Sequence, residues 1–187
     1  MLSSRNHINN EEELLQAIES FKKGSAEAFR LLYSKYKQKI FRFCLRMLGD
    51  KELAEDAFQE TFIKVYENST KFRGTNFAAW LFTIARHTCL NIIRSKKEYE
   101  SFDEVFHGSM SAQQSDVGVK DHLQKAIEML PVALRESFLL REYEECSYQE
   151  IADILGIDLS LAKVRVHRAR ILLRKLLKPL VRELNES

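Results

Sequence analysis

The chain has 187 residues, of which 45% are hydrophobic, and a formal net charge of only +2. This length suits one ordinary domain or two small ones, and the apolar fraction excludes an intrinsically disordered chain. No stretch approaches the roughly 18 apolar residues of a membrane span and the polar N-terminus lacks a signal-peptide core, so we expect a cytoplasmic protein that is not inserted in a membrane.

Composition and charge distribution indicate helices and a polyanionic partner. Phenylalanine (12) and tyrosine (6) outnumber proline (2), and long stretches lack both glycine and proline, which favours an all-α fold. Residues 70–97 carry six Lys or Arg and no acid, residues 159–182 carry eight and no acid, and residues 50–67 carry six acids and two lysines. A solvated helix face explains any one of these runs. Together they predict two nucleic-acid sites and one protein-binding site.

Residues 1–97 predict one compact helical domain, because apolar residues recur at helical spacing between polar caps and glycine stops. In chain order we expect a short helix around residues 14–21 that stops at Gly24, a second capped by Ser25, a third capped by Asp50, a polar loop over residues 69–76, and a fourth helix over residues 77–97 with Trp80 in its buried stripe.

Residues 98–118 differ in composition from the rest of the chain. They contain no Lys or Arg, show no steady hydrophobic period and collect Ser, Gln, Gly and Asp, which is typical of a flexible linker. About twenty flexible residues average roughly 25 Å end to end and stretch further, so two flanking domains can lie on DNA more than one helical turn apart. Residues 119–187 predict a second small helical domain.

The second domain contains a predicted helix-turn-helix. Ser147 and Glu150 form a capping-box pattern that opens a short helix, Gly156 supplies the turn, and Ser160 is suited to cap a longer helix. The buried stripe of that helix consists of Ala162, Val166, Ala169, Leu173 and Leu176. A basic second helix fits the major groove of DNA, although a basic packing helix is an alternative. The candidate DNA-contacting residues are Ser160, Leu161, Lys163, Val164, Arg165, His167, Arg168 and Arg170.

This segment closely resembles region 4 of bacterial sigma factors, which binds the −35 promoter element. The matching residues are Glu150-Ile151-Ala152, Leu155-Gly156-Ile157, Lys163, Arg165 and His167-Arg168-Ala169-Arg170. Leu161, Ala162 and Val164 depart from the family, where Thr, Val and Ser are common. Because Leu161 and Val164 fall on the groove side, we expect apolar contacts there in place of hydrogen bonds, such as one with a thymine methyl group, and the family's usual −35 sequence is not assumed for this chain.

The first domain resembles sigma region 2. Residues 54–62 (AEDAFQETF) match the helix with which the family docks on a coiled coil of the β′ subunit of RNA polymerase. The match implies that Asp56, Gln59 and Glu60 contact polymerase. Acids at three- and four-residue spacing form one exposed face that can meet basic residues, although a plain solvated face has the same pattern.

A second segment of this domain resembles the part of region 2 that reads and melts the −10 element. The match rests on Lys71-Phe72-Arg73-Gly74, Trp80-Leu81 and Ile84-Ala85. It implies that the loop captures an unstacked base, as polar and aromatic groups do in single-strand binding sites. Phe72 serves equally well as a core anchor that closes the loop. The candidate −10 residues are Lys71, Phe72, Arg73, Asn76, Arg86, Asn91, Arg94, Lys96 and Lys97, with His87 beside them.

Region 2 followed by a linker and region 4, without a recognisable region 1.1 or full region 3, is typical of the extracytoplasmic-function (ECF) group of the sigma-70 family. The resemblance implies a specificity subunit without catalytic residues that binds core polymerase through the β′ coiled coil and the β flap, reads promoter DNA, and is restrained by an anti-sigma factor.

No cofactor or metal site is expected, because Cys44, Cys89 and Cys146 lie far apart and are read as buried thiols, and no glycine motif forms a phosphate loop. Two alternatives remain open. One is a conventional helix-turn-helix repressor or activator, which would bind operator DNA without polymerase. The more distant one is an enzyme whose catalytic residues come together only on folding.

Overall fold

The computed structural model describes the backbone of residues 2–74, 76–103 and 119–186. Within these ranges the regular secondary structure consists of helices, and there are no β-strands. The predicted all-α fold is therefore confirmed. The elements are α1 (Leu2–Lys22), α2 (Ala26–Leu48), α3 (Lys51–Glu67), the 3₁₀ turn η1 (Ser69–Lys71), α4 (Phe77–Asp103), α5 (Val119–Glu128), α6 (Val132–Glu142), α7 (Tyr148–Leu155) and α8 (Leu159–Glu186).

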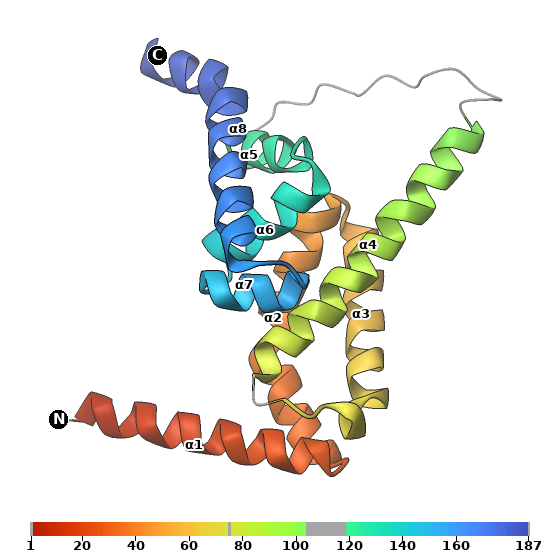
Figure 1. The fold of residues 1–187 in the computed structure, drawn as a ribbon, viewed down its shortest axis with the longest axis vertical. Helices are drawn as coiled ribbons and strands as arrows, with labels where there is room; N and C mark the ends of the chain where they lie inside the picture. The colour runs from red at the N-terminus through yellow and green to blue at the C-terminus, as the bar shows by residue number, and fades with distance from the viewer. Residues whose placement is uncertain (1, 75, 104–118, 187) are drawn as a thin grey trace.

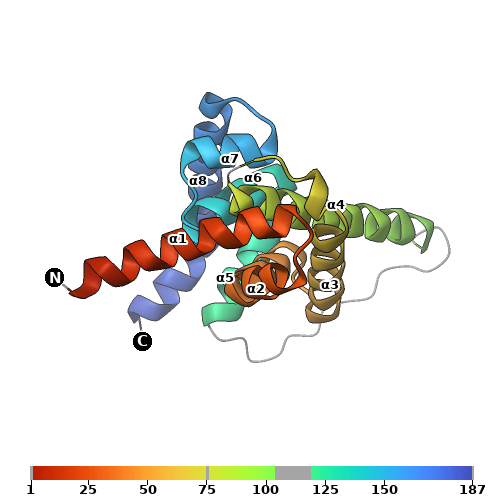
Figure 2. The same cartoon turned by 90° about the horizontal axis from the view of Figure 1, so that it is seen from below.

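Helices α1 to α4 form the first module. Helices α2, α3 and α4 pack against one another, and α1 lies across one end of this bundle, where it contacts α2 and η1 (Figures 1 and 2). Fully buried Ile40, Cys44 and Met47 follow the inner side of α2 at helical spacing. The ring of Phe21 from α1 meets that of Phe77 from α4 edge-on, with 5.3 Å between the centroids, so aromatic packing joins the ends of the module.

The helix caps form as the sequence predicts. The Ser25 hydroxyl accepts a hydrogen bond from the Ala28 amide at 3.3 Å, and the Asp50 carboxylate accepts one from the Leu53 amide at 2.9 Å. Gly49 ends α2 at a φ of 71°, a left-handed conformation that glycine adopts without a steric penalty. The two helices are thereby separated by a two-residue corner.

Two helices are longer than predicted. Helix α1 begins at Leu2. The prediction placed its start later, because the first turns of the helix are polar and show no apolar stripe in the sequence. Helix α4 continues to Asp103, six residues beyond the predicted end at 97, since nothing in the sequence EYESFD breaks a helix. The remainder of the predicted linker, residues 104–118, lies outside the described residues.

Helices α5 to α8 form the second module, in which α8 packs against α5, α6 and α7 (Figure 1). The predicted stripe lies in its core: Ala162, Val166 and Ala169 are fully buried, and Leu173 is 5% exposed. Small residues at these positions let α8 approach α6 closely.

The two modules pack against each other. Helix α4 contacts α7, and α2 contacts α5 and α6 (Figure 1). The Arg135 guanidinium of α6 donates a 2.6 Å hydrogen bond to the Met47 carbonyl at the end of α2, where helix carbonyls lack partners of their own. Beside it, the Arg46 guanidinium lies 3.9 Å from the centroid of the Tyr143 ring. Polar contacts thus join the modules in addition to the buried apolar cluster, which continues through both.

Candidate functional site

The helix-turn-helix is built by local hydrogen bonds. The Ser147 hydroxyl accepts from the Glu150 amide at 3.2 Å, and the Glu150 carboxylate accepts from the Ser147 amide at 2.8 Å. These bonds lower the pKa of Glu150 and fix the start of α7. Gly156 ends α7 at a φ of 63°. The prediction that Ser160 caps the next helix is wrong, because α8 already begins at Leu159 and Ser160 lies in its first turn.

The outer face of α8 presents most of the predicted −35 residues to solvent. Leu161 and Val164 are 39% and 41% exposed, so they add apolar area to this face. Two predicted residues are only partly exposed, because Arg165 pairs with Glu136 at 3.5 Å and Arg170 pairs with Glu142 at 2.5 Å. The exposed members of the set are Ser160, Leu161, Lys163, Val164, His167 and Arg168.

The predicted −10 loop is closed by Phe72. Its side chain is 3% exposed, and its ring lies 4.8 Å from that of Trp80 and 5.9 Å from that of Phe77. This position agrees with the core-anchor interpretation, and in this conformation the ring is not available for stacking on a base. Thr75 lies outside the described residues. The exposed predicted residues of the loop are Lys71, Arg73 and Asn76.

Asn76 has a structural task as well. Its side-chain oxygen accepts a 2.9 Å hydrogen bond from the Ala79 amide, which caps α4. Its side-chain nitrogen donates a 3.1 Å bond to the Glu150 carboxylate of α7. The predicted DNA loop therefore touches the helix-turn-helix of the other module.

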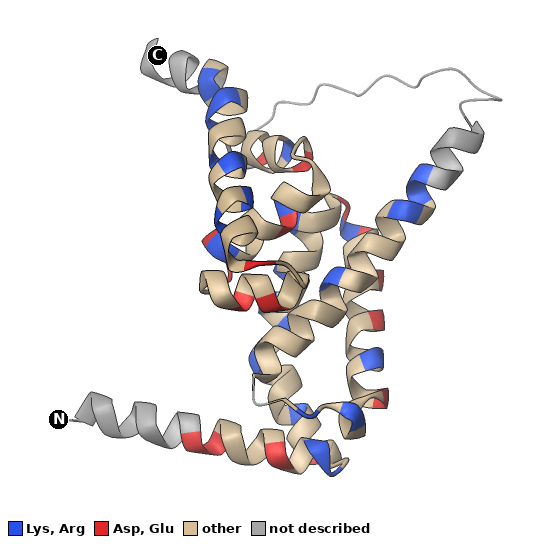
Figure 3. Ribbon diagram, in the orientation of Figure 1, with Lys and Arg blue, Asp and Glu red and all other residues tan. Residues whose placement is uncertain are grey.

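Helix α4 carries a basic surface (Figure 3). Unlike the other basic residues predicted on α4, Arg86 is largely buried. Its guanidinium forms an ion pair with the Glu136 carboxylate at 2.7 Å. Burial and the nearby Arg86 lower the pKa of His87, so this imidazole is suited to donate or accept a hydrogen bond as a neutral group. The predicted residues that are exposed on α4 are Asn91, Arg94, Lys96 and Lys97.

The acidic face of α3 is exposed as predicted. Asp56, Gln59 and Glu60 all lie on the solvent side, and the ribbon of α3 is red at its acidic residues in Figure 3. Glu60 pairs with Lys64 one turn later at 2.5 Å. Such a surface pair contributes little to stability, so the face remains available to a basic partner.

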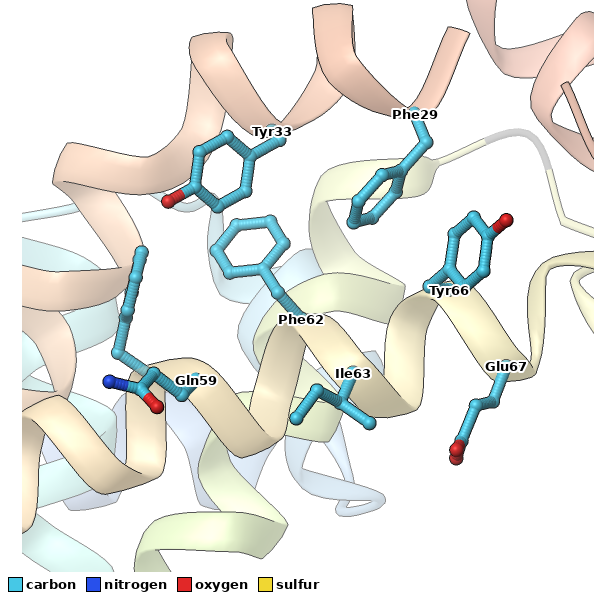
Figure 4. Close-up of a pocket in the computed structure, with 8 residues that line it drawn as sticks. Phe29, Tyr33, Gln59, Phe62, Ile63, Tyr66 and Glu67 are labelled. Atoms are coloured by element: carbon cyan, nitrogen blue, oxygen red, sulfur yellow. The ribbon is translucent and has the colours of Figure 1, made fainter. Parts of the chain in front are cut away.

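An aromatic groove beside this face was not predicted. It has a volume of about 440 Å³ between α2 and α3, and Figure 4 shows the rings of Phe29 and Tyr33 opposite Phe62 and Tyr66. Ile63 is 56% exposed and Tyr66 50% exposed. Both residues lie outside the buried stripe of α3. Apolar residues at positions that the helical pattern places on the solvent side are the sequence feature that could have indicated the groove.

The described residues contain no group of three or more His, Cys, Asp or Glu that could hold a metal ion. Cys44 and Cys89 are buried and Cys146 is partly buried. A hydrogen bond with Cys44 and burial raise the pKa of Cys89, and burial raises that of Cys146 to about 12, so the thiols of Cys89 and Cys146 are protonated and unreactive near neutral pH. Among the helices described, none is apolar over a length that would cross a bilayer.

Comparison with known proteins finds two family matches in this chain. The family described as "Sigma-70 region 2" matches residues 32–99, and "Sigma-70, region 4" matches residues 120–173. The ECF RNA polymerase sigma factor SigW of Bacillus subtilis is 35% identical over 179 residues, which cover 87% of this chain and 96% of SigW. The RNA polymerase sigma-H factor of Pseudomonas aeruginosa is 32% identical over 189 residues, with 92% and 98% of the two chains covered.

A solved structure has a similar fold. The sigma factor RpoE of Bartonella quintana, crystallised with the anti-sigma factor NepR, superposes with a TM-score of 0.70 at 30% identity and covers 82% of this chain and 98% of RpoE. The similarity extends over both modules, so the order of helices along the chain and their packing are shared.

Proposed function

Because the chain belongs to the ECF group of the sigma-70 family, we propose that it binds core RNA polymerase and directs it to promoters by reading their −10 and −35 elements. The observation that carries this proposal is the combination of three surfaces on one small chain: a basic α4, an α8 with exposed polar and apolar side chains, and an acidic α3. The protein then acts in the cytoplasm with polymerase and supplies specificity, while polymerase supplies catalysis.

The polymerase-docking surface is assigned to α3. Asp56, Gln59 and Glu60 provide charge and hydrogen bonding, and the aromatic groove beside them provides apolar area through Ile63 and Tyr66. Binding sites commonly combine a central apolar anchor with a polar rim. A basic segment with apolar side chains, such as the β′ coiled coil implied by the family, fits both parts.

The DNA-binding surfaces are assigned to α8 and to the loop and helix around α4. Arg168 and Lys163 are exposed on α8, where a guanidinium can read a guanine edge and an ammonium can neutralise a phosphate. Leu161 and Val164 supply the apolar contacts. Around α4, we assign Lys71, Arg73 and Arg94 to the DNA backbone and to the melted strand, and Phe72 to holding the loop in shape.

A second polymerase contact and an anti-sigma factor belong to the same proposal. Leu123, Phe138, Leu173 and Leu177 line an open groove of about 680 Å³ between α5, α6 and α8, with Arg174 at its rim. We assign this groove to the β flap. The anti-sigma factor bound to the RpoE relative leads us to expect a comparable regulator that covers the docking surfaces of this chain.

Transcription from a promoter library tests the proposal. Core polymerase of the same bacterium, mixed with the chain, should produce transcripts from a restricted set of promoters. The double variant Asp56→Lys/Glu60→Lys should lose polymerase binding and transcription, because like charges then face each other across the contact with the basic partner. The matched control Glu12→Lys/Glu13→Lys reverses two exposed acids on α1 and should keep both. Full activity of the α3 variant would refute the docking surface.

A gel-shift assay separates this proposal from a conventional repressor or activator. A sigma factor should bind promoter DNA weakly when alone and tightly with polymerase, since each module alone makes few phosphate contacts. Tight, sequence-specific binding by the isolated chain would favour the repressor or activator.

A further inference from the structure

The end of α1 lies against the predicted −10 loop. Helix α1 contacts η1, with which that loop begins (Figure 1), although α2 and α3 separate the two elements along the chain. The sequence match with region 2 starts at residue 32, so α1 lies outside it. No residue of α1 is among the predicted DNA-binding residues. The last turn of this helix therefore makes a contact with the loop that only the folded structure reveals.

Phe21, in the last turn of α1, packs against the rings that enclose the loop. It is 1% exposed, and its ring lies 5.3 Å from that of Phe77 and 6.2 Å from that of Trp80. The same two rings hold Phe72 of the loop, at 5.9 and 4.8 Å. Because such a cluster is close-packed, loss of the Phe21 ring leaves a space into which its neighbours can move.

Lys22, the next residue, contacts the loop directly. Its Nζ lies 5.4 Å from the centroid of the Phe72 ring, which is within the range of a cation–π interaction. The Glu19 carboxylate accepts a 2.6 Å hydrogen bond from the same Nζ, and the Lys22 side chain is only 19% exposed. The ammonium group is therefore held over the ring.

The loop backbone depends on where the Phe72 ring lies. A Cβ at Gly74 would meet Phe72 Cε2 at 3.1 Å, so the ring lies directly against the backbone two residues further on. Lys71 and Arg73, on either side of Phe72, are exposed. A shift of the ring would therefore displace the segment that carries the charges assigned to the melted strand.

Building on the proposed function, we propose that Phe21 and Lys22 are positioning residues for the −10 loop. They keep Phe72 in place and thereby hold the loop in the shape that receives an unstacked base, without contacting DNA themselves. A loop held in its binding shape loses less conformational entropy when it captures the strand. The end of α1 thus affects melting and −10 selectivity, while −35 reading and polymerase docking use α8 and α3.

Trp80 reports on the loop without polymerase or DNA, because it is the only tryptophan of the chain. Phe21→Leu removes the ring and keeps apolar bulk, and Lys22→Gln removes the cation over Phe72. Both variants should increase the quenching of Trp80 fluorescence by acrylamide, since the loop then covers the indole less well. Lys22→Gln guards against a folding defect, because Lys22 lies outside the buried core and helical circular dichroism should stay at the wild-type level.

Each variant has a matched control. Phe43 is also 1% exposed, and its ring meets that of Phe82 edge-on at 5.4 Å, so Phe43→Leu should lower the melting temperature about as much as Phe21→Leu. Lys23 is the exposed neighbour of Lys22, and Lys23→Gln removes the same charge. Both controls should quench as the wild-type chain does.

Permanganate footprinting with core polymerase measures the effect on melting at a promoter from the library. Phe21→Leu should lower the fraction of melted −10 DNA about tenfold and Lys22→Gln about threefold, as expected for the loss of two aromatic contacts and of one exposed cation–π contact. Base preference within the −10 element should relax in both variants. Polymerase affinity and −35 preference should stay unchanged, and the two controls should melt DNA normally.

Three results would overturn the positioning role. Equal melting defects in Phe21→Leu and Phe43→Leu would show that only stability matters, and equal defects in Lys22→Gln and Lys23→Gln would show that charge alone matters. Wild-type quenching in both α1 variants would show that α1 does not hold the loop. Quenching needs no polymerase, so a wild-type chain that yields no transcripts would refute the proposed function separately.

Discussion

The arginines predicted to contact DNA fall into two groups according to their partners. Arg86, Arg165 and Arg170 are held by carboxylates of α6, whereas Arg168 points from the exposed face of α8. A guanidinium already held by a protein anion must exchange that partner before it contacts DNA, and an exposed one need not. Arg168 is therefore the residue best placed to read a base directly, and Lys163 the one best placed for a phosphate.

The variant Arg168→Ala should relax sequence preference at one −35 position. Loss of a base-reading arginine costs about 1–3 kcal/mol of discrimination at that base pair. Lys163→Ala is the matched comparison, because it should weaken binding to all sequences alike. Sequencing of transcripts made from a library randomised in the −35 region measures both effects. An unchanged preference with Arg168→Ala would remove this residue from the readout.

Glu144, in the turn after α6, should make stability depend on pH. It is 8% exposed, and its Oε2 has no hydrogen-bond partner. Burial raises its pKa from 4.5 to about 7, with Glu145 acting in the same direction and Lys39, Arg42 and Arg46 of α2 opposing. The folded protein thus holds a proton that the unfolded chain releases, so the free energy of unfolding should fall by up to about 3 kcal/mol as the pH rises from about 4.5 to 7.

The comparison with Glu144→Gln isolates this contribution. Urea unfolding at several pH values should show equal stability near pH 4, and a variant more stable than wild type at pH 8. Glu145→Gln, which removes the neighbouring exposed carboxylate, serves as the control and should follow the wild-type curve closely. A Glu144→Gln curve parallel to that of wild type would mean that Glu144 is ionised in the folded state.

At the scale of elements, local chemistry decides where most helices begin and end. The caps at Ser25, Asp50 and Ser147 and the glycine stops at Gly49 and Gly156 involve residues within a few positions of one another, which is why sequence alone predicts them. Where such signals are missing, the sequence predicts the helix end at the wrong residue: α1 starts earlier, in a polar stretch, and α4 continues beyond residue 97. Nothing local distinguishes those residues from loops.

Two glycines that end helices should respond alike to alanine. Gly49 and Gly156 have similar φ angles of 71° and 63°, so either substitution incurs a strain of about 1–2 kcal/mol. A Cβ at Gly49 would meet the Glu128 carboxylate of α5, which is the end of a flexible side chain and can turn aside, and a Cβ at Gly156 meets nothing within 4 Å. Gly49→Ala and Gly156→Ala should therefore lower the melting temperature by similar amounts. A much larger loss with Gly49→Ala would show that Glu128 is held in place.

At the scale of the whole molecule, the sequence predicts two modules but not their contact. Arg86 and Glu136 are 50 residues apart, and neither belongs to a hydrophobic period or a cap that would reveal the pairing. The same holds for the aromatic groove, which depends on how α2 and α3 are placed side by side. Predictions based on spacing succeed within a helix, and contacts between distant helices require the folded structure.

The closed arrangement should also respond to salt. The contact between the modules includes charged groups at Glu136 and Arg46, and the buried apolar residues form one cluster that continues through both modules. Raising the ionic strength from about 0.01 to 1 M shortens the screening length from about 30 to 3 Å, which weakens the partly exposed charge pairs more than the apolar cores. The radius of gyration of the wild-type chain should therefore rise with sodium chloride while its helical circular dichroism stays constant. A wild-type radius independent of salt would show that apolar packing rather than charge holds the modules together.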